Sequence, residues 1–191
     1  MKTVLLDLFG VACPDEFKKR IMYPMFRDML EAQVDAAYNT FKFGQIDEEE
    51  FWARLGWDMP EGRAEMLKRV QMDPHLREVV AYLRRKNYAV VLFSDFPKVW
   101  LDMIARRNSL QPLFDKVVST PEWGYAKNNA NLYAEATRQF GECIMVDDNL
   151  AHLAIASRHG IATVWKKGLM EGTSFEPDRV IRYLDELKEV V

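Results

Sequence analysis

The chain has 191 residues, of which 49% are apolar, and its formal net charge is -3. This composition is that of a folded globular protein and excludes a disordered or fibrous one. Lys and Arg form no long run, which excludes the basic surface that binding to nucleic acid or an anionic membrane requires. We therefore expect a small-molecule partner and a chain that is a monomer or a homodimer.

Two further features bear on the compartment. Cys13 and Cys143 are too few and too far apart for a metal cluster, so both are expected to be reduced. No charged-then-apolar leader precedes the first apolar run, and no apolar stretch reaches the roughly 18 residues that span a bilayer. These features predict a cytoplasmic protein.

The first predicted element is a short strand from Val4 to Leu6. Residues 15–72 then contain several amphipathic stretches and no convincing strand, and one stretch is opened by Asp47 with Glu50 as a capping box. This segment is predicted to be an all-helical insertion of about four helices over the mouth of a sheet. Its expected dividing points are Pro24, Gly44, Gly56 and Gly62.

From residue 73 onward, strands and helices alternate. Asp73 and Pro74 are predicted to open a helix that ends near Asn87, because apolar residues follow at helical spacing. The later strands are predicted at Ala89–Phe93, Lys116–Val118, Cys143–Val146 and Ile161–Trp165. The later helices are predicted at Lys98–Arg107, Asn129–Phe140, Leu150–Arg158 and Pro177–Glu189.

The strands are continuously apolar, as strands buried on both faces of a parallel sheet are. The predicted fold is therefore α/β, with a Rossmann-like three-layer core around a parallel sheet and a small helical cap. The core domain is expected to comprise residues 1–14 and 73–191, and the cap domain residues 15–72.

Polar residues follow the predicted strands at the point where ligands bind in an open α/β sheet. Asp7 follows the first strand, Ser94 and Asp95 follow the second, and Asp147 and Asp148 follow the fourth. A loop with Gly124 and Lys127 lies beyond the third. A single acid at such a place is usually a turn or capping residue, but here the set occurs together.

In order and spacing, these residues resemble the four motifs of the haloacid dehalogenase-like hydrolase superfamily. The first motif resembles Val4–Val11, the second Val90–Ser94, the third Gly124–Lys127 and the fourth Val146–Asp148. The helical insertion stands where that family carries its smaller type of cap.

The resemblance implies a catalytic set of Asp7, the nucleophile, with Ser94 and Lys127, which hold the transferring group. It implies Mg²⁺ as the cofactor, bound by Asp7, Asp148 and the Phe9 carbonyl, with Asp147 acting through water. Oxygen ligands suit this hard cation, which neutralises charges that would otherwise repel. Phe9, Gly10, Asp95 and Lys127 are the expected substrate-binding residues.

Phe9 departs from the pattern, since most phosphatases of the family carry a second Asp there as general acid and base. Losing that function costs about 10²- to 10⁴-fold in rate, so alkyl phosphate monoesters should be poor substrates. One interpretation is a Mg²⁺-dependent phosphatase or phosphoryl-transfer enzyme whose leaving group needs little protonation. A second is a 2-haloacid dehalogenase, which Phe9 favours and the paired acids oppose. The third is a non-catalytic relative that binds a ligand or a protein.

Several other charged residues have no clear role in the sequence. Asp95 is an extra acid near the site or a turn residue before Pro97. His75, His152 and His159 have no ligand spacing and are assigned nothing. The cap cations Lys18, Lys19, Arg20 and Lys42 are candidates to meet a substrate anion, although charged residues on short helices are usually solvated.

Overall fold

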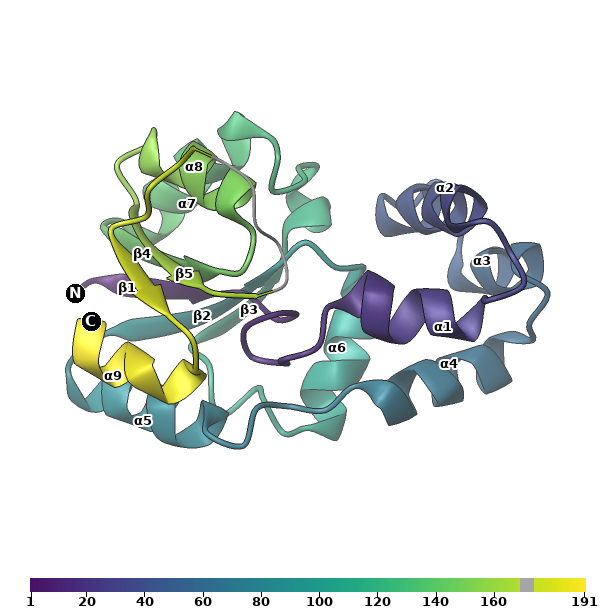
Figure 1. Ribbon diagram of the computed structural model, residues 1–191, viewed down its shortest axis with the longest axis horizontal. Helices are drawn as coiled ribbons and strands as arrows, with labels where there is room; N and C mark the ends of the chain where they lie inside the picture. The colour runs from purple at the N-terminus through teal and green to yellow at the C-terminus, as the bar shows by residue number, and fades with distance from the viewer. Residues whose placement is uncertain (169–173) are drawn as a thin grey trace.

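The computed structural model describes residues 1–168 and 174–191 and has a parallel sheet between two layers of helices (Figure 1). The six strands in the described residues follow the order β3-β2-β1-β4-β5-β6, and every pairing is parallel. Their bounds are β1 Thr3–Leu6, β2 Ala89–Ser94, β3 Lys116–Ser119, β4 Cys143–Asp147, β5 Ala162–Lys166 and β6 Arg179–Ile181. The predicted Rossmann-like α/β fold is confirmed.

Successive side chains of a strand point to opposite faces of the sheet, and each face has its own apolar layer. Leu5, Val91 and Met145 face the layer of α7 (Ala130–Phe140) and α8 (Leu150–Ser157). Val4, Leu92 and Val146 face the other layer. That second layer contains α5 (Leu76–Arg85), α6 (Lys98–Arg107) and α9 (Leu187–Val190). As predicted, the strands are apolar along their whole length because helices bury both faces of the sheet.

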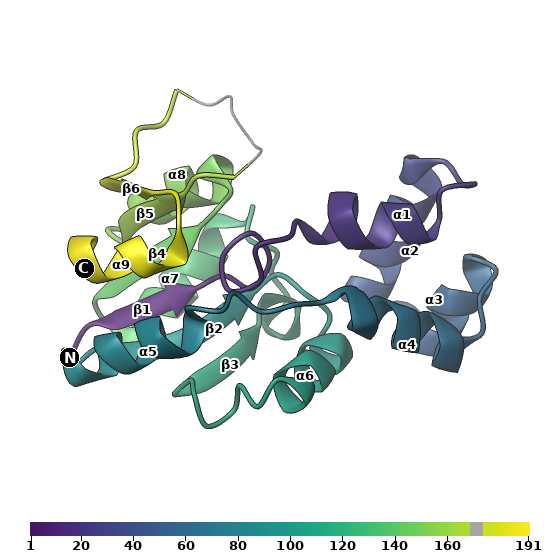
Figure 2. The ribbon, with the colours of Figure 1, turned by 60° about the horizontal axis from the view of Figure 1, so that its bottom comes forward.

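Residues 15–72, the helical segment, contain only helices and lie beyond the carboxyl ends of the strands (Figures 1 and 2). The helices are the π-helix η1 (Phe17–Met22), α1 (Tyr23–Met25), α2 (Glu31–Lys42), α3 (Glu48–Arg54) and α4 (Met59–Arg69). Asp47 caps α3 as predicted, since its Oδ1 accepts the N–H of Glu50 at 2.8 Å. The division of the chain into two domains stays a prediction.

Two of the predicted dividing points in the helical segment were wrong. Pro24 lies inside α1, where the helical chain passes from the π-helix η1 into a single α-helical turn without a break. Gly62 lies inside α4, where its lack of a side chain lets the helix approach Trp52. A Cβ on Gly62 would lie 2.4 Å from Cε3 of that ring. By contrast, Gly44 and Gly56 have positive φ and follow the ends of α2 and α3.

The predicted terminal helix over residues 177–189 was also wrong. The chain forms the edge strand β6 there, followed by the 3₁₀-helix η3 (Leu184–Glu186) and the single turn of α9. Asp178 fixes the strand, because its Oδ2 accepts the N–H of Thr163 at 2.7 Å and the hydroxyl of Thr163 at 2.9 Å. This contact aligns β6 beside β5. A smaller difference is that α5 begins at Leu76, two residues after Pro74, and Asp73 accepts the N–H of His75.

An aromatic cluster joins the helical segment to α6. Trp100 of α6 lies among rings of the helical segment, with ring centroids 4.7 Å from Phe41, 5.1 Å from Phe51 and 5.5 Å from Trp52. Its Nε1 donates to the buried carboxylate of Glu48 at 2.8 Å. Burial opposes ionisation of Glu48, but hydrogen bonds from Arg63, Trp100 and Trp52 outweigh it and lower the pKa of this carboxyl.

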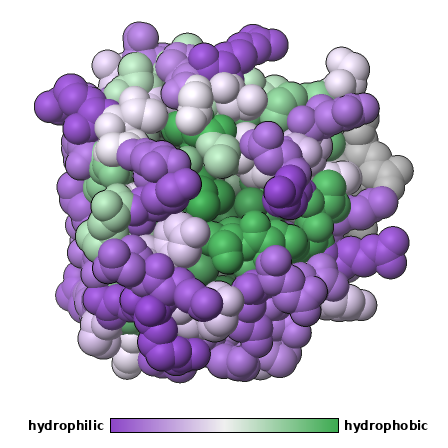
Figure 3. Space-filling model, turned by 90° about the vertical axis from the view of Figure 1, so that its left-hand side faces the viewer, coloured by the Kyte–Doolittle hydropathy of each residue, from purple (hydrophilic) through white to green (hydrophobic). Residues whose placement is uncertain are grey.

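The opposite end of the molecule, where both chain termini lie, presents an apolar area surrounded by hydrophilic side chains (Figure 3). No helix in the described ranges is long and apolar enough to cross a membrane.

Trp100 is expected to carry much of the stability of the contact between the two parts. Trp100→Ala should lower the free energy of unfolding by about 3–5 kcal/mol, since it leaves a cavity in a packed aromatic cluster. Trp100→Phe, the matched control, retains a ring but removes the hydrogen bond to Glu48, which costs about 1–3 kcal/mol. Urea unfolding followed by circular dichroism measures both, and a midpoint unchanged in Trp100→Ala would contradict the assignment.

Candidate active site

The loop after β1 places Asp7 at the centre of the carboxyl edge of the sheet. β1 pairs with both β2 and β4, so Asp7 lies where the chain order of the strands reverses. Its N–H donates to the carbonyl of Val146 at 3.0 Å, which aligns it with the end of β4. The loop then turns back on itself, with the Ala12 N–H donating to the Asp7 carbonyl at 3.2 Å.

Three carboxylates converge at this edge. Asp7, Asp147 and Asp148 each offer one oxygen, and these oxygens all lie within 4.8 Å of one another. Asp147 is the last residue of β4, and Asp148 follows it. The structure therefore brings together the three acids that the sequence predicted to be metal ligands.

Gly10 makes the position of Asp148 possible. It has φ +78°, and a Cβ built on it would lie 2.2 Å from Oδ2 of Asp148. Its carbonyl accepts a hydrogen bond from Lys166 Nζ at 3.0 Å. The structure therefore places Gly10, an expected substrate-binding residue, beside Asp148, where its missing side chain leaves space.

Lys127 is the fixed cation of the cluster. Its buried Nζ lies 2.8 Å from Oδ1 of Asp7 and 2.8 Å from Oδ2 of Asp147. The hydroxyl of Tyr133 donates to the Lys127 carbonyl at 2.7 Å, which ties the loop to α7. The N–H of Leu8 also donates to Oδ1 of Asp7, at 2.7 Å. The Lys127 ammonium and the Leu8 N–H together fix the orientation of the Asp7 carboxylate.

The four groups strongly shift one another's pKa values. Burial raises the pKa of Asp148 to about 7, with the charge of Asp147 adding to the effect. Burial also raises the pKa of Asp7, against the lowering effect of Lys127. Burial disfavours ionised Asp147 too, but Lys127 and His152 outweigh it and hold the pKa of that carboxyl well below its usual range. The pKa of Lys127 is raised, since the charges of Asp147 and Asp7 outweigh its burial.

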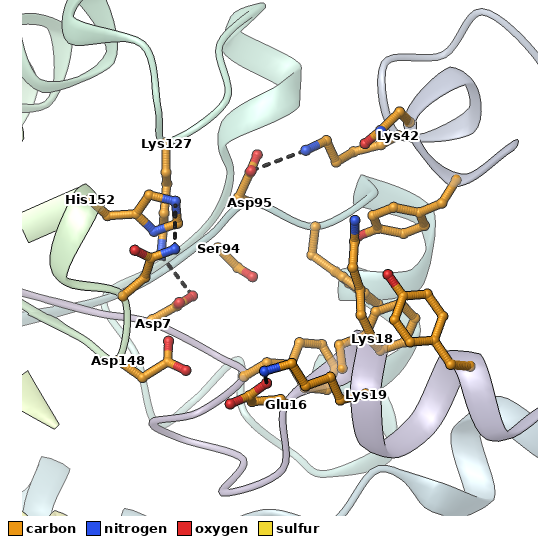
Figure 4. Close-up of a pocket in the computed structure, with 17 residues that line it drawn as sticks. Asp7, Glu16, Lys18, Lys19, Lys42, Ser94, Asp95, Lys127, Asp148 and His152 are labelled. Atoms are coloured by element: carbon orange, nitrogen blue, oxygen red, sulfur yellow. Dashed lines mark hydrogen bonds and ion pairs between the residues drawn. The ribbon is translucent and has the colours of Figure 1, made fainter. Parts of the chain in front are cut away.

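A cavity of about 430 Å³ lies between this cluster and the helical segment (Figure 4). Its walls include every predicted catalytic residue. The lining residues are Asp7, Phe9, Glu16, Phe17, Lys18, Lys19, Tyr23, Tyr38, Asn39, Lys42, Ser94, Asp95, Phe96, Lys127, Asp148, Asn149 and His152.

Phe9 and Asp95 lie on the wall of the cavity that faces the helical segment. The Phe9 ring packs against Phe17 at 5.0 Å and Phe96 at 4.9 Å between centroids, so this part of the wall is apolar. Asp95 does not cap α6, whose N-cap is Pro97. Its carboxylate instead accepts hydrogen bonds from Lys42 Nζ at 3.0 Å and Thr120 Oγ1 at 3.1 Å.

The structure separates the cations of the helical segment. Lys18, Lys19 and Lys42 line the cavity, and Figure 4 shows them across it from Asp7 and Lys127. Arg20 is not among the lining residues and borders a different hollow, beside Lys166. Three of the four candidate cations therefore line the cavity, and each is paired with a carboxylate. Lys18 pairs with Asp35 at 2.8 Å, Lys19 with Glu16 at 3.2 Å and Lys42 with Asp95 at 3.0 Å.

Sequence reasoning assigned no role to several residues that line the cavity, among them His152 and Glu16. His152, in the first turn of α8, has its Nδ1 3.3 Å from Oδ1 of Asp147. Its place three residues after the N-cap Asn149 was the available signal, because the first turn of a helix after a strand faces the strand end. Glu16 lies just before η1.

A family model described as haloacid dehalogenase-like hydrolase matches residues 1–160. Since this is most of the chain, the chain belongs to the haloacid dehalogenase-like hydrolases, and the predicted resemblance is confirmed. No curated protein matches the chain.

Several solved structures share the fold over nearly the whole chain. A HAD phosphatase from Thermococcus onnurineus has a TM-score of 0.70 and 20% identity, over 100% of this chain and 97% of that one. An L-2-haloacid dehalogenase from Xanthobacter autotrophicus, with chloropropionic acid covalently bound, has a TM-score of 0.71 and 14% identity. The match covers 100% of this chain and 98% of that one. A HAD hydrolase from Bacillus subtilis bound to magnesium has a TM-score of 0.71 and 16% identity. The match covers 99% of this chain and 97% of that one. The activities named among them include both phosphatase and dehalogenase.

The raised pKa of Asp148 gives the metal-free protein a pH-dependent stability. Folded Asp148 keeps its proton to about pH 7, whereas the unfolded chain releases it near the ordinary value of 3.8. The stability that protonated Asp148 gives the folded state is therefore complete below about pH 4, and it is lost as the pH rises to about 7. Asp148→Asn should become more stable relative to the wild type by up to about 1.4 kcal/mol per pH unit over this range.

Urea unfolding of both proteins in a chelator, at a series of pH values, measures this difference. A difference that stays constant with pH would contradict the raised pKa.

Proposed function

We propose that the chain is a Mg²⁺-dependent phosphatase or phosphoryl-transfer hydrolase that forms a covalent intermediate on Asp7. The convergence of Asp7, Asp147 and Asp148 on one fixed lysine carries this proposal. Three carboxylates against one ammonium leave an excess of negative charge in a buried place, which a divalent cation would balance. The raised pKa values of Asp7 and Asp148 support this proposal. A raised carboxyl pKa means that added positive charge at that place is favourable, whether a proton or a metal ion supplies it.

The residues fit Mg²⁺ by their chemistry. The cluster consists of carboxylate oxygens, which this hard cation prefers, and the Phe9 carbonyl is the further ligand that the family resemblance implies. Gly10 leaves space beside Asp148 that any side chain would fill. When bound, Mg²⁺ would neutralise the charge that builds up between the nucleophile and an anionic substrate.

The remaining chemistry belongs to the side chains of the chain. Asp7, oriented by Leu8 and Lys127, is the nucleophile that attacks phosphorus, and Lys127 also neutralises charge on the transferring group. Ser94 is the hydroxyl donor to the phosphoryl oxygens, consistent with its place in the cavity wall. His152 supports Asp147 through its Nδ1 contact.

Three lysines of the helical segment are the groups that would meet the body of an anionic substrate, each in exchange for its present carboxylate partner, Asp35, Glu16 or Asp95. The acidic cluster lies on the sheet side, while Lys18, Lys19 and Lys42 lie on the helical side (Figure 4). A substrate with a phosphoryl group toward the sheet would have the lysines beside the rest of its body. The cavity of about 430 Å³ corresponds to a small metabolite.

Phe9 limits which phosphoryl compounds would react. Its ring packs between Phe17 and Phe96 and supplies no proton to a leaving group. Substrates with acidic leaving groups, such as acyl phosphates, are therefore the proposed class, with low turnover of alkyl monoesters. The same aromatic wall favours a second candidate, 2-haloacid dehalogenation by Asp7, in which no leaving-group proton is required.

An activity panel with and without Mg²⁺ tests these candidates. Acetyl phosphate should be hydrolysed faster than sugar phosphates, and only with Mg²⁺, because Phe9 cannot assist a poor leaving group. Asp7→Asn should lower this activity by about 10³-fold or more, as loss of a nucleophile does. Phosphate and halide release are the measurements, and metal-independent halide release from 2-haloacids would replace the phosphatase proposal with the dehalogenase.

Gly10→Ala tests the metal site without removing a ligand. The new Cβ would displace the Asp148 carboxylate, so Mg²⁺ affinity should fall about 10- to 100-fold, as it does when support for a ligand is lost. Titration calorimetry measures the affinity.

The matched control for this variant is Gly160→Ala. Gly160 has a similar φ of +73°, but a Cβ there meets nothing within 4 Å. Both variants should lose stability from the strained backbone, and only Gly10→Ala should lose Mg²⁺ affinity. Equal Mg²⁺ affinities in the two variants would count against Asp148 as a ligand.

A further inference from the structure

Glu16 carries an unusual carboxylate on the cavity wall. Its Oε2 pairs with Lys19 Nζ at 3.2 Å, while its Oε1 is buried without a hydrogen-bond partner. Among the side chains of the described residues, this oxygen is the one buried polar atom in that condition. A buried acceptor without a donor costs free energy, so its presence calls for an explanation.

A structural role does not account for it. Glu16 is the N-cap residue of η1, but its side chain makes no capping hydrogen bond. It also lies outside the group of three acids whose oxygens are within 4.8 Å of one another, so it is not one of the clustered ligands. Glu16 thus lines the cavity and has one carboxylate oxygen, Oε1, that accepts no hydrogen bond.

The fold brings the residues before and after Glu16 against the loop that contains Phe9. The Gly10 N–H donates to the Asp15 carbonyl at 3.2 Å, which brings the end of the loop back to its start. The next residue, Phe17, packs its ring against the Phe9 ring at 5.0 Å. Figure 4 shows Glu16 on the Asp148 side of the cavity, with Asp7 beyond Asp148, and the charge of Glu16 is one of those that raise the pKa of Asp148.

We propose that Glu16 is the general base that activates water in the second half of the reaction, in place of the acid missing at Phe9. This inference rests on the proposed phosphatase function. Water attacks the phosphorus of phosphoryl-Asp7, a new P–O bond forms, and the bond from phosphorus to the Asp7 oxygen breaks. The proton of the water passes to a Glu16 oxygen and then to solvent, and Asp7 is released as the carboxylate.

The contacts of Glu16 agree with this role. Lys19 Nζ, 3.2 Å from Oε2 of Glu16, holds that side chain at the cavity wall. The torsion that turns the carboxylate plane is broad and low in barrier, so either oxygen can be presented to water in the cavity. His152, which also lines the cavity, has its Nδ1 on Asp147 and belongs to the support of the acidic cluster. Because the first half then lacks an acid, the role matches substrates with acidic leaving groups.

Glu16→Gln separates the two halves of the reaction. Mixed with acetyl phosphate and Mg²⁺ and quenched, the variant should form phosphoryl-enzyme as fast as the wild type and then accumulate it. Steady-state phosphate release should fall about 10²- to 10⁴-fold, the usual contribution of a general base. Intact-protein mass spectrometry detects the added phosphoryl group. Glu16→Asp should recover part of the release, and the neighbouring Asp15→Asn, as control, should match the wild type.

The competing explanations give different results. Phosphate release from Glu16→Gln at the wild-type rate would overturn the assignment of the base. So would a loss of Mg²⁺ affinity in this variant that matches its loss of activity, since that identifies a metal-binding role. Failure of the wild type itself to form any phosphoryl-enzyme would overturn the proposed phosphatase function, and with it the role of Glu16.

Discussion

The ammonium group of Lys127 between Asp7 and Asp147 is the contact on which the site depends. Two carboxylates from neighbouring strand ends lie 2.8 Å from the same buried nitrogen. Without that cation, an uncompensated buried carboxylate would destabilise the fold by about 3–5 kcal/mol. The constraint extends outward: the Lys127 loop is tied to α7 by Tyr133, and the β1 loop turns tightly enough at Gly10 to leave room for Asp148. The layout of the sheet edge follows from these few contacts.

Much of the fold was predictable because buried parallel strands are continuously apolar and leave a clear trace in the sequence. The strands β1 to β5 and the helix α6 were located within a residue or so of their bounds. The C-terminal segment failed for a physical reason. Ile181, Leu184 and Leu187 are spaced by three residues, which a helix and a strand followed by turns satisfy equally well. The contact that decides between them joins Asp178 to Thr163, and no local pattern reveals it.

Within the site, the clustered acids and Lys127 were predictable because they follow strands whose carboxyl ends must meet at one edge. The residues contributed by helices were predicted only as a set of candidate cations, of which three line the cavity. Lys18 and Lys19 lie on a π-helix, whose wider turn changes which neighbours share a face, so α-helical spacing could not separate them from Arg20. Glu16 was missed because its notable feature is a buried carboxylate oxygen without a hydrogen-bond donor. Only the three-dimensional packing around the side chain shows that feature.

The position of Trp100 has a consequence for how ligands enter and leave. A helical segment that swung away from the sheet would pull Phe41, Phe51 and Trp52 off this ring and expose Glu48 to water. Such an opening would resemble partial unfolding in its energetic cost, and it would be correspondingly rare. Lys42 and Asp95, which both line the cavity and lie 3.0 Å apart, form a second contact that such an opening would have to break. Opening of the cavity on this side would therefore be coupled to the loss of both the aromatic contact and the ion pair.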